Sequence, residues 1–177
     1  MSESNITKKK QEGKNFLAGV HDDDTVQIIG FGLGEEEFGV DIFAVKEIIR
    51  MPAMTRVPNS PEFVVGVVNM RGKVIPIIDL CIRFGLPMTD IGTKERKIIV
   101  IEHENKIVGF LVDMVYEVAK IAKSVTEPPP PMVSGIDSDY ITAIAKLEDK
   151  LLILLEISKI LVLVNEKGIF HTGHIGK

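Results

Sequence analysis

Two groups of residues have types and spacings that could hold a phosphate or a metal ion. Gly30 to Gly34, GFGLG, superficially resembles a phosphate-binding glycine pattern. Such a loop must follow a strand and open a helix, whereas these glycines alternate with apolar residues and an acidic turn follows. His171 and His174 are three apart, but they lie in a Gly-rich tail without a nearby cysteine or carboxylate. Because a zinc site needs three or four protein ligands, we expect glycines on one face of a strand and no metal.

The residue types that serve as nucleophiles or acid–base pairs are not arranged for catalysis. Cys81 stands among apolar residues, and a catalytic cysteine needs a neighbouring base that is not visible here. His103 falls in a predicted turn, where solvent exposure is the simpler interpretation. Carboxylates are plentiful, but no pair stands out as an acid–base couple. The sequence therefore predicts no enzyme and no cofactor, with Cys81 packed in a core.

Arg71 is the charged residue most suggestive of binding. It lies in the turn Asn69-Met70-Arg71-Gly72, between residue types that tolerate unusual backbone angles. A solvated charge is the ordinary alternative for an arginine at a turn. Arginine is also enriched at protein interfaces, where its planar fork pairs with carboxylates.

An internal near-repeat strengthens the case for Arg71. Gly66 to Leu80 reads GVVNMRGKVIPIIDL, and Ala143 to Ile157, AIAKLEDKLLILLEI, matches its hydrophobic pattern without a gap. Both segments read as a hairpin, and together they suggest an internal duplication. The turns differ, because the second copy has Glu148-Asp149 where the first has Arg71-Gly72. A fold needs both hairpins, but only the first carries an exposed-looking arginine.

Composition limits the class of protein. The 177 residues fit one domain or two small lobes that share a core, and 45% are hydrophobic and 26% charged. The longest apolar runs are far shorter than the roughly 18 residues of a membrane span, and the N-terminus lacks the apolar region of a signal peptide. The net charge of −4 argues against a nucleic-acid binder. The single cysteine fits a reducing cytoplasm.

The first half of the chain reads as strands around short helices. Residues 1–24 lack a regular period and are expected to form a flexible arm. Alternating runs from Val26 to Ile42 predict a hairpin, and Ile42 to Ile49 has helix spacing with Asp41 as N-cap. Pro76 cannot donate a ladder hydrogen bond and predicts an edge or a bulge. Asp79 to Gly85 reads as one helical turn with an Asp cap and a Gly stop.

The second half begins as the first does. Ile98 to Ile101 and Ile107 to Val112 read as strands, and Val112 to Val118 echoes Val40 to Ile48. A proline-rich connector precedes the repeated hairpin in both halves, and an apolar helix follows from Glu156 to about Val164. We expect a domain over residues 25–165, with one lobe at about 25–90, another at about 95–165, interleaving allowed, and a loose tail at 166–177. Strands this short favour two small five-stranded barrels, because closure removes exposed edges.

The order of these segments resembles the CheW family of bacterial chemotaxis coupling proteins. The resemblance runs through FGLGEEEFGVDIFAVKEII, RVPNSPEFVVGVVNMRGKVIPIIDL, RFGLP, IVGFLVDMVYEVAKI and YITAIAKLEDKLLILLEISKIL, from about Val26 to Leu163. The positions that fall at the family's spacing are Pro58, Pro61, Gly66, Asn69, Arg71, Gly72, Pro76 and Asp79.

The resemblance implies a mostly β fold of two five-stranded SH3-like barrels that share a core, with a few short helices. It also implies a non-enzymatic adaptor that bridges the cytoplasmic tip of a chemoreceptor and the regulatory domain of a chemotaxis histidine kinase. Such a protein would be a monomer when free, without cofactor, metal or membrane insertion. It would be cytoplasmic and recruited to membrane-associated receptor arrays.

The resemblance also implies two sets of binding residues. The receptor set is Arg71, Asn69 and Gly72, together with Ile42, Val45 and Glu47. The kinase set is Thr55 and Arg56. The alternatives are a barrel that binds nucleic acid or a nucleotide, and a small enzyme. The first would place basic and aromatic residues along one strand, but the chain has no Trp and two Tyr. The second would need a polar constellation that the sequence lacks.

Overall fold

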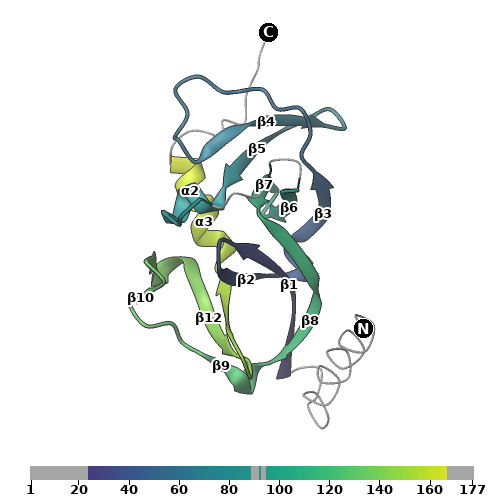
Figure 1. Ribbon diagram of the computed structural model, residues 1–177. Coiled ribbons are helices and arrows are strands. Elements are labelled where there is room, and N and C mark those ends of the chain that lie inside the picture. The colour runs from purple at the N-terminus through teal and green to yellow at the C-terminus, as the bar shows by residue number, and fades with distance from the viewer. Residues whose placement is uncertain (1–23, 89–91, 93–94, 167–177) are drawn as a thin grey trace.

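The protein is built mainly of strands arranged in two large sheets, one above the other in Figure 1, with a separate two-stranded sheet formed by residues 132–133 and 136–137. The computed structural model describes residues 24–88, 92 and 95–166. The expected arm at 1–24 and tail at 166–177 therefore lie outside the described residues, apart from Asp24 and Glu166. So does the pair His171 and His174.

Most elements follow one another with short connections, and the longest described one joins Arg50 to Val64. The strands are β1 (Thr25–Leu33), β2 (Glu36–Asp41), β3 (Val45–Arg50), β4 (Val64–Met70), β5 (Lys73–Asp79), β6 (Lys97–His103), β7 (Lys106–Val112), β8 (Met114–Ala122), β9 (Thr126–Glu127), β10 (Met132–Val133), β11 (Ile136–Asp137), β12 (Ile141–Lys146) and β13 (Leu151–Leu155). The helices are η2 (Ile42–Ala44), α2 (Leu80–Phe84), η3 (Lys123–Val125), η4 (Ser138–Tyr140) and α3 (Ile157–Glu166).

Each sheet takes strands from both halves of the chain. The six-stranded sheet has the order β8-β1-β2-β13-β12-β9, and the five-stranded sheet has the order β3-β6-β7-β5-β4. The halves at about 25–90 and 95–165 thus each contribute to both sheets. The chain passes from the six-stranded to the five-stranded sheet at η2, and back again between β7 and β8.

Both sheets close into barrels in the same way, because one stretch of chain pairs with both edges of the sheet. In the six-stranded sheet, β8 pairs with β1 at one edge, and its continuation through η3 becomes β9, which pairs with β12 at the other edge. In the five-stranded sheet, β3 pairs with β6, and Thr55 beyond it forms an isolated bridge to Val67 of β4. With β8 and β9 counted as one bent strand, each sheet is a five-stranded barrel without long open edges, as the sequence predicts.

The duplication is visible in the register. In β4 and β5, Val68 pairs with Ile75, and a bulge lies between Val64 and Gly66. In β12 and β13, Ala145 pairs with Leu152, and a bulge lies between Ile141 and Ala143. Each hairpin also pairs in parallel with a strand from the other half, β5 with β7 and β13 with β2. The ungapped sequence match therefore corresponds to two equivalent hairpins.

The prediction of a helix from Ile42 to Ile49 is wrong. The Asp41 cap is present, since its Oδ1 accepts the Phe43 N–H at 2.9 Å, but the helical turn ends at Ala44. Val45–Arg50 continues as β3, with alternating half-buried and exposed residues. The β-branched side chains suit a strand, and pairing with β6 satisfies the backbone in a way that the local pattern could not reveal.

Pro76 is not in an edge strand, because β5 lies between β7 and β4. Val67 is paired with Pro76, but its backbone hydrogen bonds go to Thr55. The Val67 carbonyl accepts the Thr55 N–H at 3.0 Å, and the Val67 N–H donates to the Thr55 carbonyl at 2.8 Å. No ladder hydrogen bond to β4 is therefore lost at Pro76, and pairing with β7 starts one residue later, at Ile77. The bulge lies in the partner strand β4.

A shared core joins the barrels. Phe31 and Phe38 of the six-stranded sheet stack with their ring centroids 5.8 Å apart. Phe38 also stacks on Phe84 of α2, with ring centroids 6.0 Å apart. The short helix α2 has the predicted limits, with Asp79 accepting the Ile82 N–H and Gly85 in the left-handed conformation. Ile157, Ile160 and Leu161 of α3 cover the same core. Each barrel also has a smaller apolar cluster of its own.

Candidate partner-binding surface

Arg71 lies in an exposed two-residue turn at the tip of β4 and β5. Its φ is 51° and that of Gly72 is 81°, which is the mirror-image turn favoured between twisted strands. Asn69 Oδ1 accepts the Gly72 N–H at 3.1 Å. A left-handed conformation costs a non-glycine residue about 1–2 kcal/mol. The turn thus accepts strain at the position that presents the arginine.

The repeated hairpin does not reproduce this turn. Leu147 and Lys150 exchange backbone hydrogen bonds at 3.0 and 3.4 Å, so Glu148 and Asp149 form a turn of the same length but of a different backbone conformation. These residues are all described, and none has a positive φ. The asymmetry noted in the sequence at Arg71 therefore extends to the backbone.

The side chains of Arg71 and Glu47 contact each other at the surface of the five-stranded barrel. Arg71 Nη1 lies 3.2 Å from Glu47 Oε1, so the turn contacts β3. The arginine side chain is 79% exposed and the glutamate 28% exposed. A pair of this kind is worth about 0–1 kcal/mol to folding. It orients the guanidinium at the rim of a small pocket lined by Lys46, Glu47, Met70, Arg71, Lys73, Ile75, Val100 and Ile107.

Ile42 and Val45 are half-buried and pack against the shared core, as the ordinary structural interpretation would have them. Their neighbours are more accessible. Phe43 is 89% exposed and Ile48 is 42% exposed. The sequence reasoning missed these two residues because it placed this segment in a helix and assigned its apolar positions to one buried face.

β8 continues the exposed apolar surface onto the other barrel. Met114, Tyr116 and Val118 alternate along it, and all three are more than two-fifths exposed. Both Tyr116 and Met114 lie over the backbone of β1, where a Cβ at Gly32 would come within 3.0 Å of Tyr116 Oη. The glycines of β1 therefore make room for aromatic cover and do not form a phosphate loop. Period-two spacing in residues 114–118 was the signal that could have revealed this row.

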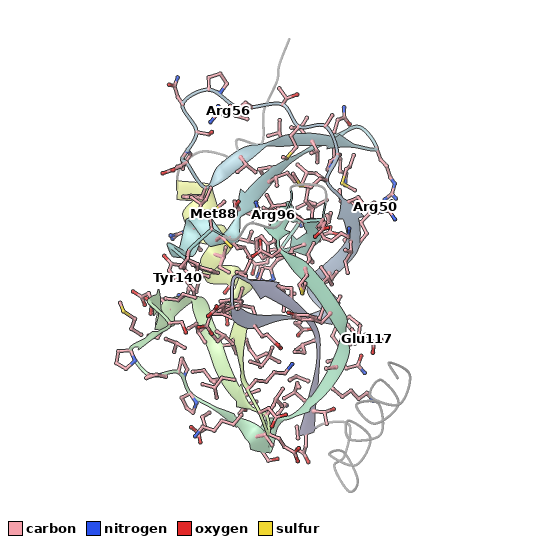
Figure 2. The ribbon with its side chains drawn as sticks, in the orientation of Figure 1. Arg50, Arg56, Met88, Arg96, Glu117 and Tyr140 are labelled. Carbon is pink, nitrogen blue, oxygen red and sulfur yellow. The ribbon has the colours of Figure 1, made fainter. Side chains whose placement is uncertain are left out.

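Thr55 and Arg56, which the resemblance implies for kinase binding, lie on the connector between β3 and β4, and Figure 2 shows Arg56 at the top of the molecule. Thr55 is fixed by its two backbone hydrogen bonds to Val67. Arg56 is exposed beside a cleft of about 570 Å³, lined by Arg56, Val57, Pro58, Asn59, Ser60, Pro61, Glu62, Val64, Val65 and Ile82. The structure thus places this pair and the Arg71 turn on the same barrel but at different positions along β4.

Cys81 has the character of a core residue. It is 1% exposed, and burial, followed by the nearby carboxylates of Asp113 and Asp79, raises its pKa to about 11. The thiol is therefore neutral at physiological pH, and the thiolate is the nucleophilic form. Within the described ranges, no three residues of the His, Cys, Asp and Glu types gather as metal ligands would. A helix long and apolar enough to cross a membrane is also absent from these ranges.

Comparisons with known proteins converge on one family. The family model of the CheW-like domain matches residues 27–164. The chain is 35% identical to the chemotaxis protein CheW of Helicobacter pylori, over 78% of this chain and 83% of that one. It is also 35% identical to CheW of Klebsiella aerogenes, over 74% of this chain and 78% of that one.

A solved structure agrees with these matches. The crystal structure of the scaffolding protein TtCheW from Thermoanaerobacter tengcongensis superposes with a TM-score of 0.69 at 41% identity, covering 75% of this chain and 84% of that one. Two barrels joined by a shared core, a duplicated hairpin and a family match over most of the chain lead to one conclusion: the protein belongs to the CheW family of non-enzymatic chemotaxis coupling scaffolds.

Proposed function

We propose that this protein links the cytoplasmic tip of a chemoreceptor to the regulatory domain of a chemotaxis histidine kinase. The observation that carries the receptor half is Arg71. It is held in a strained turn, oriented by Glu47 and largely exposed to solvent.

The receptor surface extends from Arg71 and Glu47 toward the crossover between the barrels. Exposed apolar side chains occur there on both sides, Phe43 and Ile48 on one barrel and Met114, Tyr116 and Val118 on the other. An amphipathic helical hairpin would place its apolar face against this kind of surface. Because one Arg71 nitrogen contacts Glu47 and most of the side chain faces solvent, a receptor carboxylate could accept further charge-assisted hydrogen bonds.

The kinase surface is proposed at Thr55 and Arg56. The backbone bridge fixes Thr55, so Arg56 projects from an anchored point beside the proline-lined cleft. Binding of receptor and kinase on separate surfaces allows each to bias the other through the scaffold, typically by about 1–3 kcal/mol. In this account the protein is a cytoplasmic monomer when free and joins membrane-associated arrays through its partners.

Charge reversal at Arg71 tests this proposal. The Arg71→Glu variant is titrated with a purified receptor-tip fragment, and Lys159→Glu, an exposed charge reversal on α3, is the matched control. We expect at least about tenfold weaker binding for Arg71→Glu, as for a central arginine at an interface, and unchanged binding for the control. Unchanged affinity for Arg71→Glu would remove the receptor assignment.

A further inference from the structure

Arg83 on α2 lies between two aromatic rings that belong to different barrels. Its guanidinium carbon is 5.2 Å from the ring centroid of Phe63, which precedes β4, and 4.8 Å from that of Tyr140, which precedes β12. Arg83 Nη2 also donates to the Tyr140 hydroxyl at 2.6 Å. Its Nε is buried and has no hydrogen-bond partner among the described residues. Because cation–π contacts strengthen when the cation is desolvated, both rings contribute to holding this guanidinium.

The two rings occupy equivalent positions of the internal repeat. Phe63 and Tyr140 are 77 positions apart in the sequence, which is also the separation of the two matching hairpins. Their backbones make the same contact. The Phe63 carbonyl accepts the Asp79 N–H, and the Tyr140 carbonyl accepts the Glu156 N–H, both at 2.8 Å. The duplicated fold therefore brings two equivalent aromatic residues to one place.

The equivalent helices differ at the position between the rings. The residue of α3 that corresponds to Arg83 is Ile160, which is 1% exposed and packs in the shared core. One guanidinium thus contacts the ends of two equivalent segments. These are the first connector, residues 51–63 between β3 and β4, and the second connector, residues 128–140 between β9 and β12.

The first connector carries the proposed kinase surface. Arg56 lies on it, and the lining of the cleft beside Arg56 includes Val64 and Ile82. Val64 directly follows Phe63, and Ile82 directly precedes Arg83. The contact between the arginine and the Phe63 ring therefore lies directly beside the wall of the cleft. A side chain that holds Phe63 against α2 also holds that wall in place.

We infer that Arg83 is a positioning residue that anchors both connectors and thereby fixes the shape of the kinase surface. The anchor is a property of the free protein, whereas its effect on the kinase rests on the proposed function. Tyr140 belongs to the second connector and contacts the same guanidinium. The cleft on one barrel is therefore supported from the other barrel, through Arg83.

Two substitutions of different severity test the anchor. Arg83→Met keeps an unbranched side chain and removes the charge and the donors. Tyr140→Phe is milder, because it keeps the ring and removes only the hydroxyl that accepts from Arg83. Lys159→Met is the matched control, since it removes one positive charge from an exposed position of the equivalent helix α3.

Amide hydrogen exchange in the full chain reports on each connector separately. The Asp79 N–H reports on Phe63, and the Glu156 N–H reports on Tyr140. In Arg83→Met both amides should exchange at least about tenfold faster, because loss of the cation–π contacts and the hydrogen bond lowers the free energy of local opening. The amides of β6 and β7 should exchange as in the parent. The control should leave all of these rates unchanged.

Binding measurements separate positioning from a general loss of stability. Arg83→Met should bind the kinase regulatory domain about two- to thirtyfold more weakly, which is the range for residues that affect a site without touching its ligand. Its affinity for the receptor-tip fragment should be unchanged. Tyr140→Phe should bind the kinase domain more weakly than the parent but more tightly than Arg83→Met, with faster exchange at Glu156 than at Asp79 relative to the parent.

Several outcomes would overturn the inference. In Arg83→Met, unchanged exchange at Asp79 and Glu156, or faster exchange at one of them alone, would show that the two connectors have no shared anchor. Equal acceleration throughout β6 and β7, or equal weakening of kinase and receptor binding, would show a general effect on the fold. If the parent itself does not bind the kinase domain, the proposed function fails, and the two amides still decide whether Arg83 anchors both connectors.

Discussion

Arg71 and Glu47 are 24 positions apart in the sequence, yet their side chains meet with Arg71 Nη1 3.2 Å from Glu47 Oε1. The contact joins the tip of the β4–β5 hairpin to β3, so a flexible side chain at a turn becomes an oriented one. Its contribution to folding is small because both groups reach solvent. We therefore attribute its value to recognition.

Substitution of Glu47 tests that attribution. Glu47→Gln should change the free energy of unfolding by less than about 1 kcal/mol, as for other exposed pairs, but should weaken receptor-tip binding because Arg71 loses its orienting partner. Urea unfolding and titration calorimetry measure the two effects. In the double variant with Arg71→Ala, the glutamine should have no further effect on binding. Additive losses would mean that Glu47 contacts the receptor independently of Arg71.

Relief of strain at Arg71 should separate stability from function. Arg71→Gly removes the left-handed penalty, whereas Arg71→Ala retains it, so the glycine variant should be more stable by about 1 kcal/mol. Both variants should bind the receptor tip weakly, since neither has the guanidinium. Chemical unfolding compares the two stabilities. Equal stability would show that the turn relaxes when the arginine is removed.

Gly66 should be intolerant of a side chain. A Cβ there would lie 2.9 Å from the Thr55 carbonyl oxygen, which is backbone that closes the barrel and cannot rotate away. Gly66→Ala should therefore cost about 1–3 kcal/mol of stability, as for other overpacked sites. Gly92→Ala is the matched control, because its Cβ would meet nothing within 4 Å. A Gly66→Ala variant as stable as the control would contradict the tight closure at Thr55.

Cys81 should make the protein lose stability in alkaline solution. Its pKa in the folded protein is raised from 9.0 to about 11, chiefly by burial, so the fold favours the protonated thiol. This contribution is complete below pH 9 and is lost as the pH rises toward 11, where the unfolded state has already lost the proton. The slope in that window should approach about 1.4 kcal/mol per pH unit.

Comparison with Cys81→Ala isolates this slope from the titration of lysines and tyrosines. The difference in unfolding free energy between the parent and Cys81→Ala should fall across the window. A difference that is independent of pH would show that the thiol titrates normally in the fold.

The parts of the fold that could be predicted are those with local or repeated signals. The alternating residues of β1 and β2, the Asp79 cap with its Gly85 stop, and the duplicated hairpin all appear in the structure. In the segment after Asp41, the apolar positions suit a helix as well as a strand, and long-range pairing with β6 decides between them. Local periodicity does not include that partner.

The candidate site was predicted in part for the same reason. A turn sequence identifies Arg71 as exposed, but nothing local indicates Tyr116 lying over the β1 glycines. The buried ion pairs of Arg96 with Asp79 and Asp113 were not predicted, although Asp79 was identified as a helix cap, since the three residues are distant in sequence and follow no period. The resemblance predicts which residues bind partners, while the contact between Arg71 and Glu47 comes from tertiary structure.

Titration calorimetry of the protein into the regulatory domain of a chemotaxis histidine kinase tests the central claim most directly. The account predicts micromolar binding at one-to-one stoichiometry, weakened by Arg56→Ala and unaffected by Arg71→Ala. Absence of heat, together with failure of the two proteins to co-elute, would contradict the adaptor assignment.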